Sequence, residues 1–347
     1  MNTKKSLLSD IFNVRDRVPV GLAPMAGTSS LTFRRICREF GSDFSTTELV
    51  SARGICYQRS VDKCFSLLEI DPETEGPCSI QLFGHDPVDF EKAIPLVLAH
   101  PKLASAVSID INMGCPVPKV VKTGAGSALM KTPDIARAII EASVRAAKPY
   151  KMPVSVKIRK GWSVDFVNAV EFAQMCADAG AAWLTIHGRT RDQMYHGQAD
   201  WAIIAEVKAA LKPLGIPVIG NGDATDAVSV QKMISETDVD AIAVGRASQG
   251  NPWIFDHIKA ELNGQEYSLI SPHTRMQVML RHLKEEADRI GEARACKEMR
   301  AQIAYYFKGQ SNASAYKAAA MRAGTVSEIE NIAAHWLSGL ATEEDAT

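Results

Sequence analysis

Residues 108–116 read SIDINMGCP, a stretch in which apolar and polar residues alternate before a glycine and a proline. An alternation of period two predicts a half-buried strand, and Gly114 and Pro116 break the extended backbone. Cys115 is therefore expected just past the carboxyl end of a strand, where the active sites of parallel α/β folds lie. A cysteine by itself is most often an inert core thiol, so the role of Cys115 depends on the rest of the chain.

Seven further short apolar stretches are bounded by Gly, Pro, Asn or Asp, and helical patterns separate them. This alternation is typical of βα units in a parallel sheet. The eight predicted strands are Val18–Ala23, Phe44–Thr47, Cys78–Leu82, Val107–Asn112, Val154–Ile158, Trp183–His187, Pro217–Asn221 and Ala241–Val244. Eight such units predict an α/β fold of the closed (β/α)8 TIM-barrel type.

Helix starts are marked between these strands. Asp86-Pro87 and Thr132-Pro133 each place a capping residue before a proline at the first helical position. Cys37 and Cys176 fall on the apolar sides of helical patterns, so we expect both thiols to be buried core residues.

The composition excludes several classes of protein. The chain has 347 residues, of which 46% are hydrophobic and 23% charged, as in ordinary globular proteins. No apolar run approaches the ~18 residues of a membrane span, and the N-terminus lacks the apolar run of a signal peptide. We therefore expect a cytoplasmic protein with no membrane partner. The seven cysteines are scattered and include no CxxC pair, which argues against a disulfide framework and a metal site.

The barrel pattern ends near Asn263-Gly264 and Ser271-Pro272. We predict a barrel domain over 1–262, a helical domain over 272–340 and an acidic tail over 341–347. The whole chain is nearly neutral, but residues 273–324 contain ten Lys or Arg against five Asp or Glu, with aromatic residues among them. This pattern is found both in RNA-contacting surfaces and in ordinary solvated helix faces.

Strand exits converge on one mouth in a barrel, and most of the exits in this chain carry small or polar residues. The exits of the last two strands read Asn221-Gly222-Asp223 and Gly245-Arg246. Glycine N–H groups and an arginine at these positions predict a phosphate site. Lys157 projects from an otherwise apolar strand, which predicts a cation for a bound anion or an electron-rich ring.

The blocks at these exits, taken in order, resemble the flavin-dependent tRNA-dihydrouridine synthases, most of all the bacterial B branch. The resemblance covers nearly the whole chain. The blocks are Ala23–Gly27, Gln81–Gly84, Asn112–Pro116, Gly124–Met130, Val156–Arg159, Ile186–Thr190, Asn221–Asp223 and Gly245–Ala247.

The resemblance implies an FMN-bearing TIM barrel followed by a small helical domain, which reduces the C5=C6 bond of a uridine in tRNA with NADPH as reductant. It implies that the isoalloxazine ring lies over Pro24, Met25 and Ala26 in the loop after the first strand, and that Gln81, Lys157 and His187 contact its polar edge. It also implies that the last two strand exits hold the phosphate, through Asn221, Gly222, Asp223, Gly245 and Arg246.

The same resemblance implies that Asn112 orients the uracil and that Cys115 is the general acid. Hydride would pass from N5 of reduced flavin to C6, and Cys115 would protonate C5. The predicted RNA contacts are Arg159, Arg300, Tyr306 and Lys308. The chain departs from the branch at Met299–Gln302, where an Arg-Lys-His run is usual. This departure bears on the RNA footprint and on which uridine is modified.

Three other functions fit parts of the sequence. An FMN barrel that reduces a free pyrimidine would not need the basic helical domain. An aldolase-type barrel would use Lys157 to form a Schiff base and would contain no flavin. A non-catalytic RNA-binding protein would not need Cys115. No Rossmann fingerprint is present, so NADPH is implied by the resemblance alone. No obligate protein partner is predicted.

Overall fold

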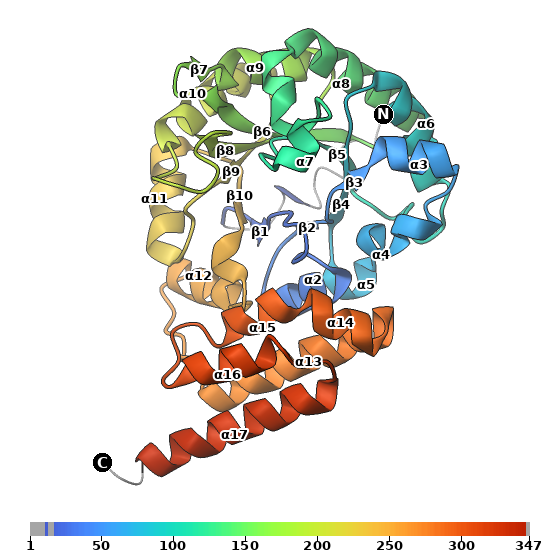
Figure 1. Cartoon of the computed structure of the whole chain (residues 1–347). Coiled ribbons are helices and arrows are strands. Elements are labelled where there is room, and N and C mark those ends of the chain that lie inside the picture. Colours follow the sequence, from blue (N-terminus) through green and yellow to red (C-terminus); the bar gives the residue numbers. More distant parts are fainter. Residues whose placement is uncertain (1–10, 13–16, 345–347) are drawn as a thin grey trace.

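The computed structural model describes residues 11–12 and 17–344, and the predicted absence of a signal peptide concerns residues 1–10, outside these ranges. A closed barrel of parallel strands is surrounded by helices, and a group of C-terminal helices packs on one side of it (Figure 1). The predicted fold class is thereby confirmed. No helix in the described ranges is long and apolar enough to cross a bilayer.

All eight predicted strands form. They are β1 (Val20–Leu22), β2 (Ser45–Thr46), β4 (Cys78–Phe83), β5 (Ser108–Met113), β6 (Val154–Ser163), β8 (Leu184–Thr190), β9 (Val218–Asn221) and β10 (Ala241–Val244). The barrel closes because β1 pairs in parallel with both β10 and β2, and β2 pairs with β4. The carboxyl ends of the eight strands therefore meet at one mouth.

Two short strands were not predicted. β3 (Val50–Ser51) pairs with the end of β4 beyond the barrel, and β7 (Phe166–Val167) pairs antiparallel with an extension of β6. Each has only two residues, which is too short for an alternating pattern to mark it in the sequence.

Helices connect the strands and cover the outside of the barrel. The α-helices are α2 (Leu31–Glu39), α3 (Ala52–Gln58), α4 (Phe65–Leu68), α5 (Pro72–Glu75), α6 (Pro87–Leu98), α7 (Pro118–Val121), α8 (Pro133–Ala147), α9 (Ala169–Asp178), α10 (Trp201–Leu211), α11 (Ala227–Thr237) and α12 (Ile254–Leu262). Short 3₁₀ segments occupy Asp62–Cys64, Gly126–Lys131, Lys148–Tyr150, Lys212–Leu214 and Arg246–Ser248.

One of the two predicted helix caps is correct and the other is wrong. The Asp86 carboxylate accepts a hydrogen bond of 2.9 Å from the Val88 N–H at the start of α6. Pro133 opens α8 as predicted, but Thr132 caps nothing with its side chain. Its hydroxyl is buried and has no partner among the described residues. The Thr-Pro pair therefore marks the helix start through proline geometry alone.

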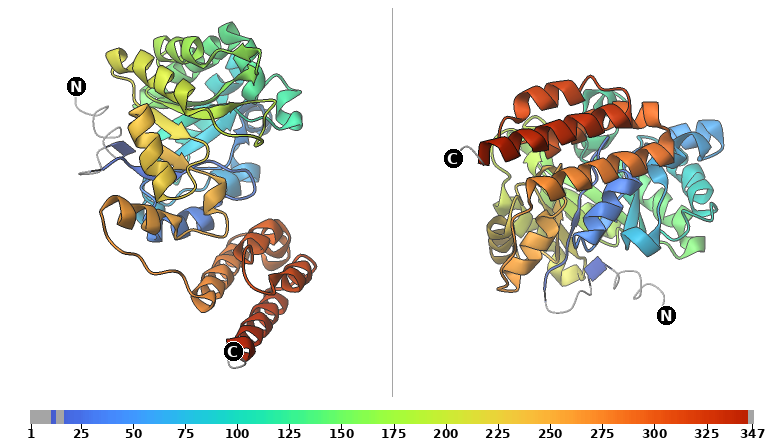
Figure 2. Two further views of the ribbon diagram at one scale, coloured as in Figure 1. Left: turned by 90° about the vertical axis from the view of Figure 1, so that its left-hand side faces the viewer. Right: turned by 90° about the horizontal axis from the view of Figure 1, so that it is seen from below.

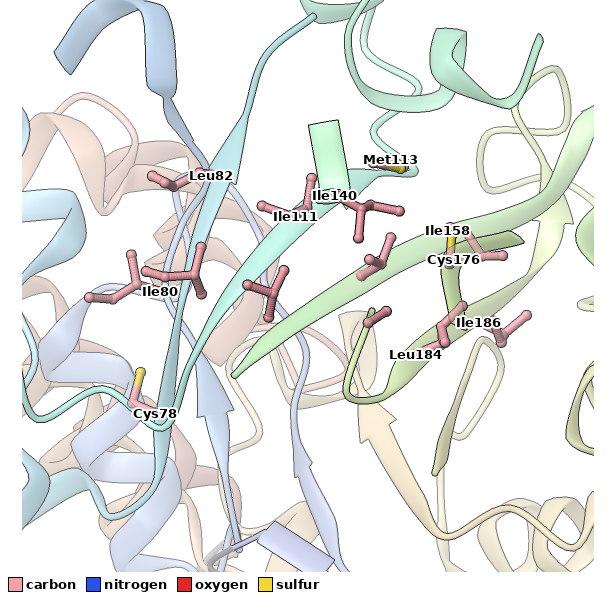
Figure 3. Packing of buried hydrophobic residues seen from close by; sticks show 14 of the residues in the cluster. Cys78, Ile80, Leu82, Ile111, Met113, Ile140, Ile158, Cys176, Leu184 and Ile186 are labelled. Carbon is pink, nitrogen blue, oxygen red and sulfur yellow. The ribbon is translucent and has the colours of Figure 1, made fainter. Parts of the chain in front are cut away.

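Side chains on the outer faces of the strands form the main core. Ile80 and Leu82 of β4, and Ile111 of β5, point between the sheet and the helices (Figure 3). Ile140 of α8 and Cys176 of α9 belong to the same cluster from the helix side, and Cys176 is fully buried as predicted. Cys37 of α2 is fully buried as well. Because strand residues alternate between faces, the residues between these apolar ones point into the barrel.

The inside of the barrel has two zones. Ile11, Phe44, Trp183 and Ile219 belong to a separate apolar cluster, which lies apart from the main core. Nearer the mouth, the inward residues are polar and buried, among them Gln81 and Asp110. Buried polar groups need hydrogen-bond partners, so this second zone must be an ordered network.

Five helices follow the barrel. They are α13 (Pro272–Ile290), α14 (Glu292–Glu298), α15 (Arg300–Tyr306), α16 (Ala313–Ala320) and α17 (Val326–Glu344). They share a hydrophobic core that contains Trp336, Phe307 and Met279, together with Ile36 and Trp253 of the barrel part. Figure 2 shows an extended connection between α12 and α13. Of the predicted tail, residues 341–344 continue α17, and 345–347 lie outside the described residues.

Polar contacts and close backbone packing dock these helices onto the barrel. The Thr32 hydroxyl donates to Glu286 of α13 at 2.7 Å, and Arg289 donates to the Ser66 carbonyl at 2.8 Å. Gly250 lies against the backbone of α15, where an added Cβ would come within 2.3 Å of the Tyr305 carbonyl carbon. Only glycine allows this approach.

We expect Gly250→Ala to destabilise the protein by at least about 2 kcal/mol more than Gly264→Ala. Both residues have positive φ, +62° and +66°, so the backbone strain is matched. No atom lies within 4 Å of a Cβ at Gly264, whereas a Cβ at Gly250 meets α15. Urea unfolding of the two variants measures the difference, and equal free energies of unfolding would contradict this account of the docking.

Candidate active site at the barrel mouth

A cavity of about 660 Å³ opens at the carboxyl ends of the strands. The eleven residues predicted to hold a cofactor all line it, as do Cys115, Asn112, Arg159 and Lys308. Tyr305 and Lys308 contribute from the C-terminal helices and the rest from the barrel. Its volume is within the roughly 300–1,000 Å³ of small-molecule sites.

A chain of hydrogen bonds at the base of the cavity starts at Asp110, whose side chain is buried. Its carboxylate accepts from the Gln81 amide at 2.7 Å and from the Ser155 hydroxyl at 2.7 Å. The Gln81 carbonyl oxygen then accepts from the Asn112 amide at 2.8 Å. Because a carboxylate only accepts, Asp110 sets the orientation of the Gln81 amide, which in turn sets that of Asn112. Burial raises the pKa of Asp110.

Asn112 in turn fixes the backbone of the loop that carries Cys115. Its carbonyl oxygen accepts from the backbone N–H groups of Gly114 and Cys115, at 3.2 and 2.8 Å. A second loop holds the other side, since the Ser127 N–H and hydroxyl both donate to the Cys115 carbonyl, at 3.0 and 2.9 Å. Cys115 is half-buried, and burial raises the pKa of its thiol. The loop thus presents a protonated thiol to the cavity.

Lys157 lies beside this loop with its ammonium 3.1 Å from the Asn221 carbonyl oxygen. Burial, together with the nearby Arg159, lowers its pKa to about 8. A cation that is costly to bury alone is stabilised by an anionic or electron-rich ligand. Lys157 therefore favours such a ligand at this point of the cavity.

Arg189 organises the opposite wall. This fully buried guanidinium donates to the Gly197 carbonyl at 2.6 Å and to both carboxylate oxygens of Asp223 at 2.7 Å. It also lies 3.5 Å from Nε2 of His187. Burial and the surrounding cations lower the pKa of His187 well below its usual range, so its imidazole is neutral at pH 7.

A cationic rim lies above this wall. Arg246 is half exposed, 3.4 Å from Asp223, with its guanidinium 4.9 Å from the ring centre of Tyr195. Arg159 is buried, donates to the Gly114 and Thr190 carbonyls at 2.8 Å, and lies 5.7 Å from the same ring. Burial lowers the pKa of Arg159 to about 10, which keeps it charged at pH 7.

Two of the predicted RNA contacts in the C-terminal helices lie away from the cavity. Tyr306 is a correction, because its ring is fully buried in the helical core and its hydroxyl lies 3.3 Å from His282. It packs the helices and cannot contact RNA; its neighbour Tyr305 lines the cavity. Arg300 is half-buried, with a buried Nε that has no partner among the described residues. Gln302, at the departure from the family pattern, lies 3.5 Å from the Gly27 carbonyl.

Four of the ten Lys and Arg residues in 273–324 form salt bridges within the molecule. Arg281 pairs with Glu39 of the barrel at 2.5 Å, and Arg289 pairs with Glu286 at 2.6 Å. Lys284 and Arg294 also form salt bridges. The charge count alone therefore overstates the free positive charge on this surface.

The sequence matches the family described as dihydrouridine synthase (Dus) over residues 21–338. It is 37% identical to tRNA-dihydrouridine synthase B of Proteus vulgaris over 82% of this chain and 85% of that protein. It is 37% identical to tRNA-dihydrouridine synthase B of Xanthomonas campestris pv. campestris over 88% of each chain. A probable tRNA-dihydrouridine synthase of Aquifex aeolicus is 34% identical over 89% of this chain and 92% of its own.

The chain belongs to the dihydrouridine synthase family. It is therefore an oxidoreductase, and the predicted family is confirmed. Among solved structures, histamine dehydrogenase from Rhizobium sp. 4-9 is similar with a TM-score of 0.52 at 14% identity, over 75% of this chain and 48% of that one. A variant of NCR from Zymomonas mobilis has a TM-score of 0.50 at 15% identity, over 77% and 95%. These two likenesses concern the barrel fold.

Besides Tyr305, three residues that shape this dihydrouridine synthase site were missed from the sequence. Asp110 alternates with apolar neighbours inside a predicted strand, which was a signal that it points into the barrel. Arg189 lies near the end of a strand, next to Gly188. Its role depends on contacts with Gly197 and Asp223, which are 8 and 34 positions away in the sequence. No pattern in the sequence marked Tyr195.

We expect Gly222→Ala to destabilise this synthase by about 2 kcal/mol more than Gly215→Ala. Gly222 has a φ of +113°, and an added Cβ would lie 2.9 Å from both the His187 ring and the Ala199 side chain. Gly215 has a φ of +67° with no atom within 4 Å of a Cβ, so the difference between the two variants contains the larger backbone strain at Gly222 as well as the contact with His187. Urea unfolding compares the two, and a similar loss in both would show that the His187 contact is unimportant.

Proposed function

We propose that this enzyme reduces the C5=C6 bond of a uridine in tRNA to dihydrouridine, with FMN as cofactor and NADPH as reductant. The observation that carries the proposal is that one cavity is lined by the Cys115 loop, by Lys157 and by the cationic wall of β8 to β10. The family supports tRNA as the substrate. In this proposal, residues 1–262 form the domain that carries out the reaction, and residues 272–340 form a helical domain that contributes part of the RNA binding.

The residues present fit FMN. Pro24, Met25 and Ala26 form one side of the cavity, and Gln81, Lys157 and His187 give it polar groups. When bound, the flavin supplies the hydride for C6 of the uracil. Lys157 would stabilise negative charge on the polar edge of the ring, and the neutral His187 can donate or accept one hydrogen bond there.

The phosphate end of the cofactor would lie between Asn221 and Arg246. Gly222 and Gly245 leave this wall free of side chains, and Arg246 is a half-exposed cation next to it. Asp223 was predicted to hold the phosphate as well. Its carboxylate instead binds Arg189 and Arg246, so we assign it the positioning of those two cations. A carboxylate facing the phosphate would repel it.

Cys115 is proposed as the acid that protonates C5 of the uracil. Burial raises the pKa of its thiol, so the proton is in place at neutral pH. Asn112 holds the backbone of the loop and lines the cavity, where it can also orient the base. Arg159, charged and fixed by backbone carbonyls, would stabilise a carbonyl oxygen or a phosphate of the substrate.

A uridine stacked in RNA cannot reach this cavity, so the base must be turned out of its strand. Tyr305 and Lys308 line the cavity from the C-terminal helices, next to the barrel residues. This two-part wall favours a macromolecular substrate over a free pyrimidine, which would not need the helices. NADPH and the uridine would use the same mouth in turn.

We expect Cys115→Ala to lower the single-turnover rate of dihydrouridine formation by about 10²–10⁴-fold, because proton delivery to C5 is lost. Flavin content and tRNA affinity should stay close to those of the wild type. Dihydrouridine is measured in tRNA from cells that lack this gene, after addition of the purified enzyme. Cys64→Ala, another half-buried thiol that does not line the cavity, is the control. A Cys115→Ala rate near that of the wild type would refute the assignment.

We expect the affinity of the apoprotein for FMN to fall by up to about tenfold per pH unit above pH 8. Lys157 loses its proton near this pH in the free protein, and an anion binds the protonated form more tightly. Lys157→Met should weaken FMN binding at pH 7 and remove this slope. Lys160→Met, on the same strand but paired with Asp200, should keep it. Fluorescence titration of FMN from pH 6.5 to 9.5 tests this, and a flat wild-type profile would count against the role of Lys157.

A further inference from the structure

A group of exposed residues on or directly after α3, α6 and α7, here called the α3–α7 rim, is not used by the active site. Its members are Arg53, Tyr57, Arg59, Lys92, Lys119 and Lys122. We propose that the α3–α7 rim is a second contact surface for tRNA, in which Tyr57 stacks on an unpaired base and the cations bind the phosphates beside it. This inference rests on the proposed function.

Tyr57 is 92% exposed, which is unusual for so large an aromatic side chain. It borders a groove of about 610 Å³ between α3 and α6, which Arg53, Arg59 and Lys92 also line. An exposed aromatic ring among cations is the arrangement with which proteins bind single-stranded nucleic acid, because every base can stack on the ring. Asp89 is the one carboxylate lining the groove, and it is half-buried.

The cations of the α3–α7 rim can bind phosphate, although Arg53 and Lys92 are also attracted by the Asp89 carboxylate in the groove. Within residues 17–344, none of them takes part in a salt bridge. In the C-terminal helices, four of the ten Lys and Arg residues of 273–324, namely Arg281, Lys284, Arg289 and Arg294, are paired with carboxylates. Free cations release counterions when they bind RNA, whereas paired ones must first give up a carboxylate.

The α3–α7 rim is continuous with the mouth of the barrel. α3 begins shortly after Leu49, and α7 begins shortly after Cys115, and both of these residues line the cavity. The Cys56 thiol donates to the Asp89 carbonyl at 2.9 Å, which ties the end of α3 to the first turn of α6, next to the carboxyl end of β4. In Figure 1, α7 lies over the strand ends and α3 lies at the edge of the barrel.

The chain offers a control at the other end of the barrel, where the Tyr150 hydroxyl lies 3.5 Å from the Pro95 carbonyl. Tyr150 is 40% exposed and lies between Lys148 and Lys151, just before β6 begins. Lys151 has a φ of +54°, and Arg59 has a φ of +53°. Replacing either residue by glycine removes one cation. Because glycine adopts these positive φ values without strain, neither substitution is expected to destabilise the fold.

The test measures the affinity of the full-length enzyme for total tRNA from cells that lack this gene, over a series of salt concentrations. We expect Arg59→Gly to lower the affinity and to reduce the slope of log K against log salt by about 0.7–0.9, the value for one lost phosphate contact. We expect Tyr57→Ala to weaken binding roughly 5- to 100-fold with little change in this slope. Lys151→Gly and Tyr150→Ala should bind like the wild type.

Wild-type affinity and slope in both α3–α7 rim variants would overturn the inference and would point to a protein as the partner of this surface. Equal losses in the two control variants would overturn it as well, because the effect would then not belong to this face. Dihydrouridine formation by the wild type is measured on the same tRNA. If the wild type forms dihydrouridine and the α3–α7 rim variants bind tRNA normally, only the inference of a second tRNA contact fails. If the wild type forms no dihydrouridine, the proposed function fails, and the inference fails with it.

Discussion

The closed interior of the barrel imposes one constraint on which the site depends, namely that every polar group facing inward must find a partner there. Asp110 meets it with both oxygens, one toward Gln81 and one toward Ser155. The chain of hydrogen bonds then continues from Gln81 through Asn112 to the backbone N–H of Cys115. A buried carboxylate that lost these donors would be strongly destabilised. The position of the thiol is thus tied to the stability of the fold.

A second buried charge, Arg189, gives order to the opposite wall by the same physics. A guanidinium taken out of water needs acceptors for its five N–H groups, and it finds them in the loop after β8 and in Asp223 after β9. Asp223 in turn lies within reach of Arg246. Strong internal pairing on this wall leaves Arg246, half exposed at the rim, as the cation most accessible to a bound phosphate.

The strands and the mouth could be predicted from short apolar runs and their exits because a parallel barrel brings every carboxyl end together. The errors have local physical causes. β3 and β7 are too short to have a period, and the Thr132 hydroxyl does not turn toward the helix start that Pro133 determines. Tyr306 and Tyr305 are adjacent in the sequence, and only the packing of α15 decides that the first is buried and the second faces the cavity.

The sequence by itself determined the barrel, the family and the set of side chains that meet at its mouth, because strand periodicity and exit motifs are local properties. The tertiary structure decided which charges remain available. It paired Arg281 and Arg289 with acids, turned the Asp223 carboxylate toward two arginines, and left the cations around Tyr57 outside any salt bridge among the described residues. Charge pairing depends on distances of a few ångströms between segments far apart in the chain, and no local pattern encodes those distances.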